Sequence, residues 1–200
     1  MRHLLINDET DHILYSTIIL LFISVIKRIV AHAQILFKEC LGLAYLTNFL
    51  ANNVPYDVSI AKLASYLEIN KTTVLSYLSS MQKAELLNLL YTDNKSVTKM
   101  QKPDKIYLHN PNMHYALSSE QKIGTIRECY VVNQLSNNHT VEYGKTQGDF
   151  KIDGKITLEV GGKDKSFEQI ADIPNSYILA DSMEFPIGKK LPLWLVGFLY

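Results

Sequence analysis

The sequence predicts an α+β protein, with helices in its first half and a small mixed sheet in its second half. Up to about residue 83, apolar side chains recur at helical spacing. From Thr140 onward they alternate with polar residues, which is the period of a β-strand. We therefore expect a helical segment with a winged helix-turn-helix over residues 1–110, followed by an α/β domain over residues 111–200.

The charge balance limits how the chain could bind nucleic acid. Its 20 basic and 20 acidic residues cancel, so any contact with DNA must come from a local basic patch. Cys40 and Cys129 lie far apart, outside any CxxC motif or zinc-ligand spacing. They predict two reduced, buried thiols in a cytoplasmic protein.

An apolar run from Ile13 to Ile26 holds fourteen residues without a charge. A membrane span needs about 20 such residues, and acidic residues precede the run where a signal peptide would be basic. We interpret the run as a buried helix, and membrane association is the less favoured alternative. A third interpretation is a helix whose partner domain is missing.

Five further elements, three helices and two strands, follow in the pattern of a winged helix-turn-helix. A helix from about Gln34 ends at Asn52-Asn53, and Ser59 and Asn70 are N-caps for two helices joined by a short turn. Strand candidates cover residues 86–91 and 105–108. Two helices joined by three or four residues, then a two-stranded wing, define this motif.

The start of the third helix is the predicted DNA-contacting surface, because first-turn side chains of a recognition helix face the groove. Lysines on the wing would reach phosphates. The alternative is packing against another protein domain, since the helix is poor in Arg and Lys. The predicted DNA-binding residues are Lys71, Thr72, Thr73, Ser76, Lys95 and Lys99.

The turn signal Asp153-Gly154 predicts a hairpin whose apolar residues all have even numbers. A three-residue loop or a bulge, pairing 151 with 155, lets these residues share one buried face. The odd-numbered Asp149 and Glu159 then share the opposite face, within reach of one metal ion, and Glu128 on the preceding helix would be a third ligand. The alternative is a solvated polar face.

The remaining elements of the second half follow from the same patterns. A helix is expected over Ile123–Leu135, strands over 140–143, 149–152, 155–160 and 177–180, and a crossing helix over 166–171. The last ten residues are apolar enough to predict a packed short helix anchored by Trp194.

Several short stretches together resemble a known family. They are residues 59–90, Gln101 to Leu108, Ile123 to Glu128, Gly148-Asp149-Phe150, Leu158 to Lys163, and Leu191 to Tyr200. In combination they are similar to the C-terminal half of bacterial and archaeal AAA+-type ATPases. Those proteins end in a domain of unknown function with a restriction-endonuclease-like, PD-(D/E)XK core.

This resemblance implies a nuclease-like site with Glu128, Asp149, Glu159 and Lys163 as its catalytic candidates. Asp149 and Glu159 would hold Mg²⁺. Two departures stand out: Gly161 occupies the position of the (D/E)xK lysine, and the ATPase half is absent. Gly144-Lys145-Thr146 supplies only the end of a phosphate loop, whose upstream glycine is replaced by His139.

We therefore expect a DNA-binding or ATPase-regulating module with a degenerate, non-cleaving nuclease-like core. Its expected partners are DNA and an ATPase domain or subunit, without a small-molecule cofactor. The alternatives are a metal-dependent DNase, which would need Mg²⁺, and a structural remnant of a larger ATPase.

Overall fold

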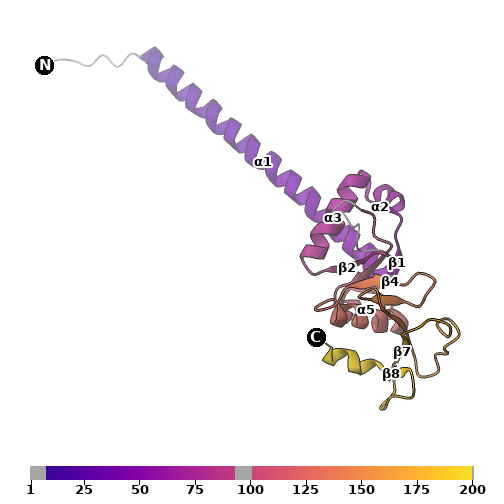
Figure 1. Cartoon of the computed structure of the whole chain (residues 1–200). Coiled ribbons are helices and arrows are strands. Elements are labelled where there is room, and N and C mark those ends of the chain that lie inside the picture. Colours follow the sequence, from indigo (N-terminus) through magenta and orange to yellow (C-terminus); the bar gives the residue numbers. More distant parts are fainter. Residues whose placement is uncertain (1–7, 93–100, 200) are drawn as a thin grey trace. The chain divides into compact units, whose positions relative to one another are not determined.

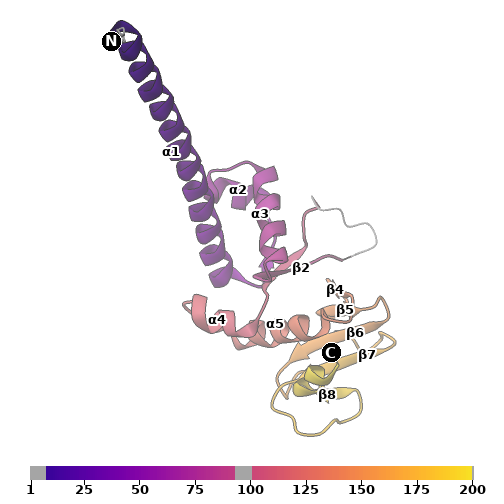
Figure 2. The ribbon, with the colours of Figure 1, turned by 90° about the vertical axis from the view of Figure 1, so that its left-hand side faces the viewer.

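The computed structural model describes residues 8–92 and 101–199. Helices dominate up to residue 83, and two β-sheets follow, so the expected mixed α+β class is confirmed (Figures 1 and 2). The chain divides into two compact units, residues 1–44 and residues 45–200. The second unit contains both sheets.

A single helix, α1 (Asp8–Asn53), stands where the sequence predicted two helical segments. It ends where expected, because the Asn52 and Asn53 side chains donate to the carbonyls of Asn48 and Phe49. The prediction of a buried helix over residues 13–26 is wrong from residue 19 on, where the side chains are exposed. In the first unit the structure describes residues 8–44, and all of them belong to α1. No other described element of that unit therefore covers this helix.

Helices α2 (Ile60–Leu67) and α3 (Lys71–Lys83) begin at the predicted caps. The Ser59 hydroxyl accepts a hydrogen bond from the Lys62 N–H, and the Asn70 side-chain oxygen accepts one from the Thr73 N–H at 2.7 Å. Between them Glu68 is left-handed, with φ of 53°, which allows the tight turn. The predicted apolar faces are buried, including Leu63, Val74 and Leu78.

A three-stranded antiparallel sheet follows, in the order β1-β3-β2. Strands β2 (Leu87–Leu90) and β3 (Lys105–Leu108) confirm the predicted pair. Strand β1 (Tyr56–Asp57) was not predicted, because two residues show no period. The predicted wing lysines Lys95 and Lys99 lie outside the described residues.

The second sheet is mixed, as expected, with the order β4-β5-β6-β7-β8. Its first three strands are antiparallel and its last three are parallel. Helix α5 (Ile123–Leu135) has the predicted bounds and packs against β6. The strands are β4 (Val141–Tyr143), β5 (Phe150–Ile152), β6 (Ile156–Gly161), β7 (Ser176–Ala180) and β8 (Lys190–Pro192).

In the second half one helix prediction is wrong and one helix was not predicted. Residues 166–171 form turns, in which Ile170 and Ile173 donate to carbonyls three residues back, and Pro174 cannot continue such a ladder. The helix α4 (Pro111–Leu117), capped by Asn110, stands where only a boundary was expected.

The C-terminal segment packs, but not through its tryptophan. The 3₁₀ helix η2 (Leu193–Phe198) buries Leu193 and Val196, whereas Trp194 is 49% exposed and donates to the Met183 carbonyl. In a short 3₁₀ helix, side chains three residues apart share one side. Leu193 and Val196 therefore face the protein, and Trp194 does not.

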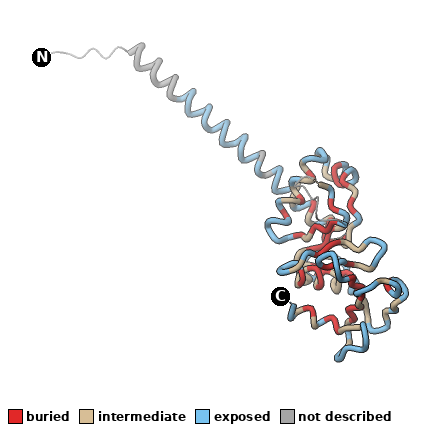
Figure 3. Tube along the Cα trace, in the orientation of Figure 1, coloured by how far each residue is buried: buried red, intermediate tan, exposed pale blue. Residues whose placement is uncertain are grey.

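The two free cysteines differ in environment. Cys129 is buried on α5 and its thiol donates to the Leu108 carbonyl at 3.0 Å, and burial raises its pKa to about 12. The predicted burial of Cys40 is wrong, since this residue lies on the exposed part of α1. Figure 3 shows the contrast between exposed α1 and the buried strands of the second unit.

The N-cap of α3 offers a direct test of the helix-turn-helix geometry. Replacing Asn70 by Ala removes the acceptor for the Thr73 N–H and should lower the free energy of unfolding by about 1 kcal/mol. Urea unfolding of the full chain measures this loss. Ser80→Ala, at an exposed position inside α3, is the control and should cost less than about 0.5 kcal/mol. Equal losses for both variants would contradict the cap.

Candidate active site

The hairpin between β5 and β6 sets the geometry of the site. Phe150 pairs with Leu158 and Ile152 with Ile156, around a turn in which the Lys155 N–H donates to the Ile152 carbonyl. The predicted pairing of 151 with 155 is therefore wrong, because Lys155 becomes the extra loop residue and the loop sits one residue later. Even-numbered residues still pair with even-numbered ones, so the expected shared face is confirmed.

Asp149 and Glu159 lie opposite each other when this register is continued by one residue. The Asp149 N–H donates to the Leu158 carbonyl, and the Val160 N–H donates to Asp149 Oδ2 at 2.7 Å. Glu159 is buried, with 2% of its surface exposed. The two predicted carboxylates thus come together, and the alternative of a solvated polar face fails at Glu159.

The lysine that reaches these acids is Lys165 and not the predicted Lys163. Lys165 Nζ lies 2.6 Å from Glu159 Oε1. Lys163 is exposed, and its backbone carbonyl accepts a hydrogen bond from Lys190 Nζ at 2.9 Å. The contact with Glu159 raises the pKa of Lys165, so the ammonium remains charged at neutral pH.

Gly161 makes room for this contact. A Cβ atom at residue 161 would lie 2.8 Å from both Cβ and Cγ of Lys165, closer than such atoms approach. The stem of Lys165 therefore passes over the glycine that stands in the place of the (D/E)xK lysine. Lys165, six residues after Glu159 in the sequence, thereby places a positive charge beside this glutamate.

Glu128 adds a third carboxylate from α5. The Tyr107 hydroxyl, on β3, donates to Glu128 Oε2 at 2.7 Å. Burial raises the pKa of Glu128, the hydrogen bond from Tyr107 opposes this rise, and the charge of Glu159 adds to it. Burial also raises the pKa of Tyr107, which keeps its hydroxyl a hydrogen-bond donor.

The electrostatics of the cluster show an excess of negative charge. Burial raises the pKa of Asp149 to about 7; the Val160 hydrogen bond opposes the rise, while the charges of Glu128 and Glu159 add to it. Lys165 and, at Glu128, Lys105 do not balance three carboxylates. The site therefore favours a bound proton or an additional cation.

The residues fit a divalent cation held by two carboxylates. Glu159 Oε2 is buried without a hydrogen-bond partner, which leaves an acceptor available. Among residues 8–92 and 101–199, no group of three or more His, Cys, Asp or Glu side chains could hold one ion, so Glu128 does not complete a third ligand. Mg²⁺ commonly takes only one or two carboxylates, with water and phosphate completing its shell.

The predicted DNA-contacting residues of α3 are only partly free. Lys71, Thr72 and Ser76 are exposed. Thr73 is half-buried, and its hydroxyl donates to the Asn70 side chain at 3.0 Å, so it belongs to the cap. The first turn of α3 thus presents one lysine and two hydroxyls to solvent.

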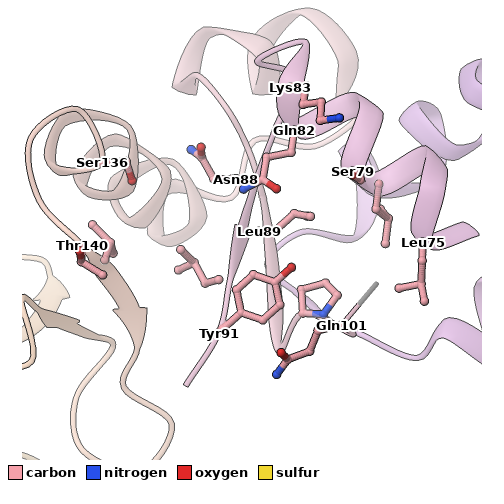
Figure 4. A pocket seen from close by; sticks show the side chains of 14 residues that line it. Leu75, Ser79, Gln82, Lys83, Asn88, Leu89, Tyr91, Gln101, Ser136 and Thr140 are labelled. Atoms are coloured by element: carbon pink, nitrogen blue, oxygen red, sulfur yellow. The ribbon is translucent and has the colours of Figure 1, made fainter. Parts of the chain in front are cut away.

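A hollow of about 500 Å³ lies away from the acids, between α3, β2 and the start of β4 (Figure 4). Gln82, Asn88, Gln101 and the ring of Tyr91 line it together with apolar side chains. Burial raises the pKa of Tyr91, so that its hydroxyl stays protonated. No carboxylate is among the described residues that line this hollow.

Sequence reasoning missed two members of the cluster. Lys165 follows Gly161-Gly162 in a segment where Lys163 and Lys165 are equally available, and spacing alone does not choose between them. Tyr107 lies in the continuous buried run from Ile106 to Leu108, and its hydroxyl contact depends on how α5 packs. Two adjacent glycines after the glutamate were the available signal that the chain could bend back.

Comparison of the chain with models of known protein families gives no match. Searches among curated proteins and among solved structures give none either.

The pKa of Asp149 predicts how stability depends on pH. Since the folded-state pKa is about 7 and the ordinary value 3.8, the folded protein keeps a proton that the unfolded chain releases in this window. The free energy of unfolding should therefore fall as pH rises from about 4 to 7. Asp149→Asn should remove this fall. Between pH 4 and pH 8 the free energy of unfolding of this variant should rise by roughly 2 kcal/mol relative to that of wild type, after allowance for solvent screening.

Urea unfolding at several pH values measures this difference. Asp164→Asn, an exposed carboxylate on the connection between β6 and β7, is the matched control and should follow the wild-type profile. A difference between wild type and Asp149→Asn that does not change with pH would contradict the raised pKa.

Proposed function

We propose that the chain is a DNA-acting protein whose carboxylate cluster hydrolyses phosphodiester bonds with the help of Mg²⁺. The observation that supports this most is the contact between Lys165 and Glu159 opposite Asp149. The sequence favoured a non-cleaving core because Gly161 replaces the expected lysine. A lysine that reaches the same glutamate over Gly161 removes that objection.

The proposed chemistry assigns a task to each side chain. Asp149 and Glu159 would hold the metal ion, which would supply Lewis-acid chemistry at the phosphate. Lys165 stabilises the negative charge that develops on the phosphate oxygens. Glu128 is held by Tyr107, and burial raises its pKa, which makes it a better proton acceptor than an exposed carboxylate.

We further propose that the two sheets belong to a winged helix and a restriction-endonuclease-like core. Two helices joined by a three-residue turn, followed by an antiparallel sheet in the order β1-β3-β2, support the first. A mixed sheet covered by α5, with the acids on β6 and just before β5, supports the second. An origin from a cytoplasmic AAA+-type ATPase remains our expectation from the sequence resemblance.

A second candidate is a DNA-binding or ATPase-regulating module that does not cleave. Lys165 and Tyr107 already satisfy one oxygen each of Glu159 and Glu128, which supports a closed structural cluster. The exposed first turn of α3 supports DNA binding in either case. The two candidates differ in whether the carboxylate cluster, with Lys165, cleaves DNA.

Cleavage of supercoiled plasmid in Mg²⁺ or Mn²⁺ tests the nuclease proposal. Wild type should nick the plasmid, and Lys165→Met should lower the rate about 100-fold or more, by the size of one lost electrostatic contact. Asp149→Asn and Glu159→Gln should lose metal-dependent activity. The readout is the rate of conversion to the nicked form.

Lys163→Met is the matched control, because it removes the same charge two residues away from an exposed position. It should keep wild-type activity. No nicking by wild type would reject the nuclease in favour of the non-cleaving module. Equal nicking by the Lys165 and Lys163 variants would contradict the role assigned to Lys165.

DNA binding through α3 makes a separate prediction. Lys71→Glu should weaken duplex binding roughly tenfold at low salt, because it reverses a charge facing the phosphates. Lys62→Glu, an exposed position on α2, is the control with the same change in net charge. Fluorescence anisotropy with a labelled duplex measures both. Equal weakening by the two variants would place the contact elsewhere.

A further inference from the structure

The first unit of the chain exposes a helix that is apolar on every side. Ile19, Leu20, Leu21, Phe22 and Ile23 are consecutive along α1, and each is between 42% and 68% exposed. Five consecutive exposed apolar residues cover all directions around a helix, whereas a surface helix shows one apolar stripe. An apolar surface of this extent marks an interaction site.

Charges at the two ends of the apolar run have opposite signs. Asp8, Glu9 and Asp11 precede it, Lys27 and Arg28 follow it, and residues 13–26 between them carry no charge. All of these residues belong to α1, so their order along the sequence is their order along the helix axis. The helix is therefore a rod with a negative start and a positive end around an apolar middle.

We propose that α1 associates with α1 of a second copy of this chain, in antiparallel orientation and centred between Ile19 and Leu20. This register places Asp11 level with Arg28 of the partner's helix and His12 level with Lys27 of that helix. Opposite charges then meet at both ends while the two apolar runs cover each other. A parallel pair would place like charges level with each other at both ends.

The same charges argue against a lipid bilayer as the occupant. Residues 19–53 of α1 are long and apolar enough to cross a membrane. The most apolar 18-residue window among them has a mean hydropathy of 1.8, and none of it is buried. The charge-free run from 13 to 26, however, reaches only about 21 Å at 1.5 Å per residue, against about 30 Å of hydrocarbon. Extending the span past residue 26 would draw Lys27 and Arg28 into the hydrocarbon, which is costly.

Because the run is apolar all round, one pair of helices leaves its outer sides exposed. Two such pairs stacked as a four-helix bundle would cover them. We therefore expect a dimer or a tetramer of the full chain, without detergent or lipid. The assembly is independent of the proposed nuclease activity, since it uses residues of the first unit.

Charge reversal tests the proposal on the full chain by sedimentation velocity at low salt. Lys27→Glu with Arg28→Glu makes both ends of α1 negative, and Asp8→Lys, Glu9→Lys and Asp11→Lys together make both ends positive. Each variant alone should sediment as a monomer, and an equal mixture of the two should associate. Lys38→Glu, an exposed position farther along α1, is the control and should associate like wild type.

Orientation is tested by disulfide cross-linking in a Cys40→Ser background. Ser16→Cys mixed with Ile23→Cys should form a mixed dimer, because 16 lies level with 23 in the antiparallel register. Ser16→Cys alone should not cross-link, whereas a parallel pair would join 16 to 16. A wild-type monomer, association indifferent to charge reversal, or recovery only with phosphatidylcholine vesicles would each overturn the proposal.

Discussion

The pairing of Phe150 with Leu158 across β5 and β6 is the constraint on which the site depends. Both side chains must be hidden, and the period of two in a strand then sends their odd-numbered neighbours to the opposite face. In many antiparallel hairpins that opposite face meets water. Here α5 packs against β6, and Thr157 and Glu159 are buried as well. The carboxylates are consequently interior groups.

Interior carboxylates need compensation, and the fold supplies it from three directions. Lys165 comes from the connection after β6, the Val160 N–H from the strand itself, and the Tyr107 hydroxyl from the other sheet. Each of them satisfies one oxygen. The raised pKa of Asp149 and the unpartnered Glu159 Oε2 show that compensation is incomplete. This deficit leaves room for the cation that the proposed function needs.

Periodicity and capping predicted α2, α3, α5 and most strands, because those elements are decided by local residue types and by which face is buried. The pairing of Asp149 with Glu159 was likewise predictable, since parity survives a shift of the loop by one residue. Lys165 was not, because its reach depends on the path of a glycine turn. The exposure of α1 was not the favoured prediction either. An apolar sequence indicates that a surface is to be covered, but it does not identify what covers it.

The contacts of β3 have a consequence for dissecting this protein. Tyr107 donates to Glu128, the Leu108 carbonyl accepts from Cys129, and the His109 carbonyl accepts from the Asn133 side chain at 2.9 Å. All three cross the boundary expected near residue 110, within one compact unit. A fragment beginning at residue 111 would keep its carboxylates yet lose the strand that orders them. The strand and the last ninety residues therefore share these contacts, and we expect such a fragment to be less stable than the whole unit.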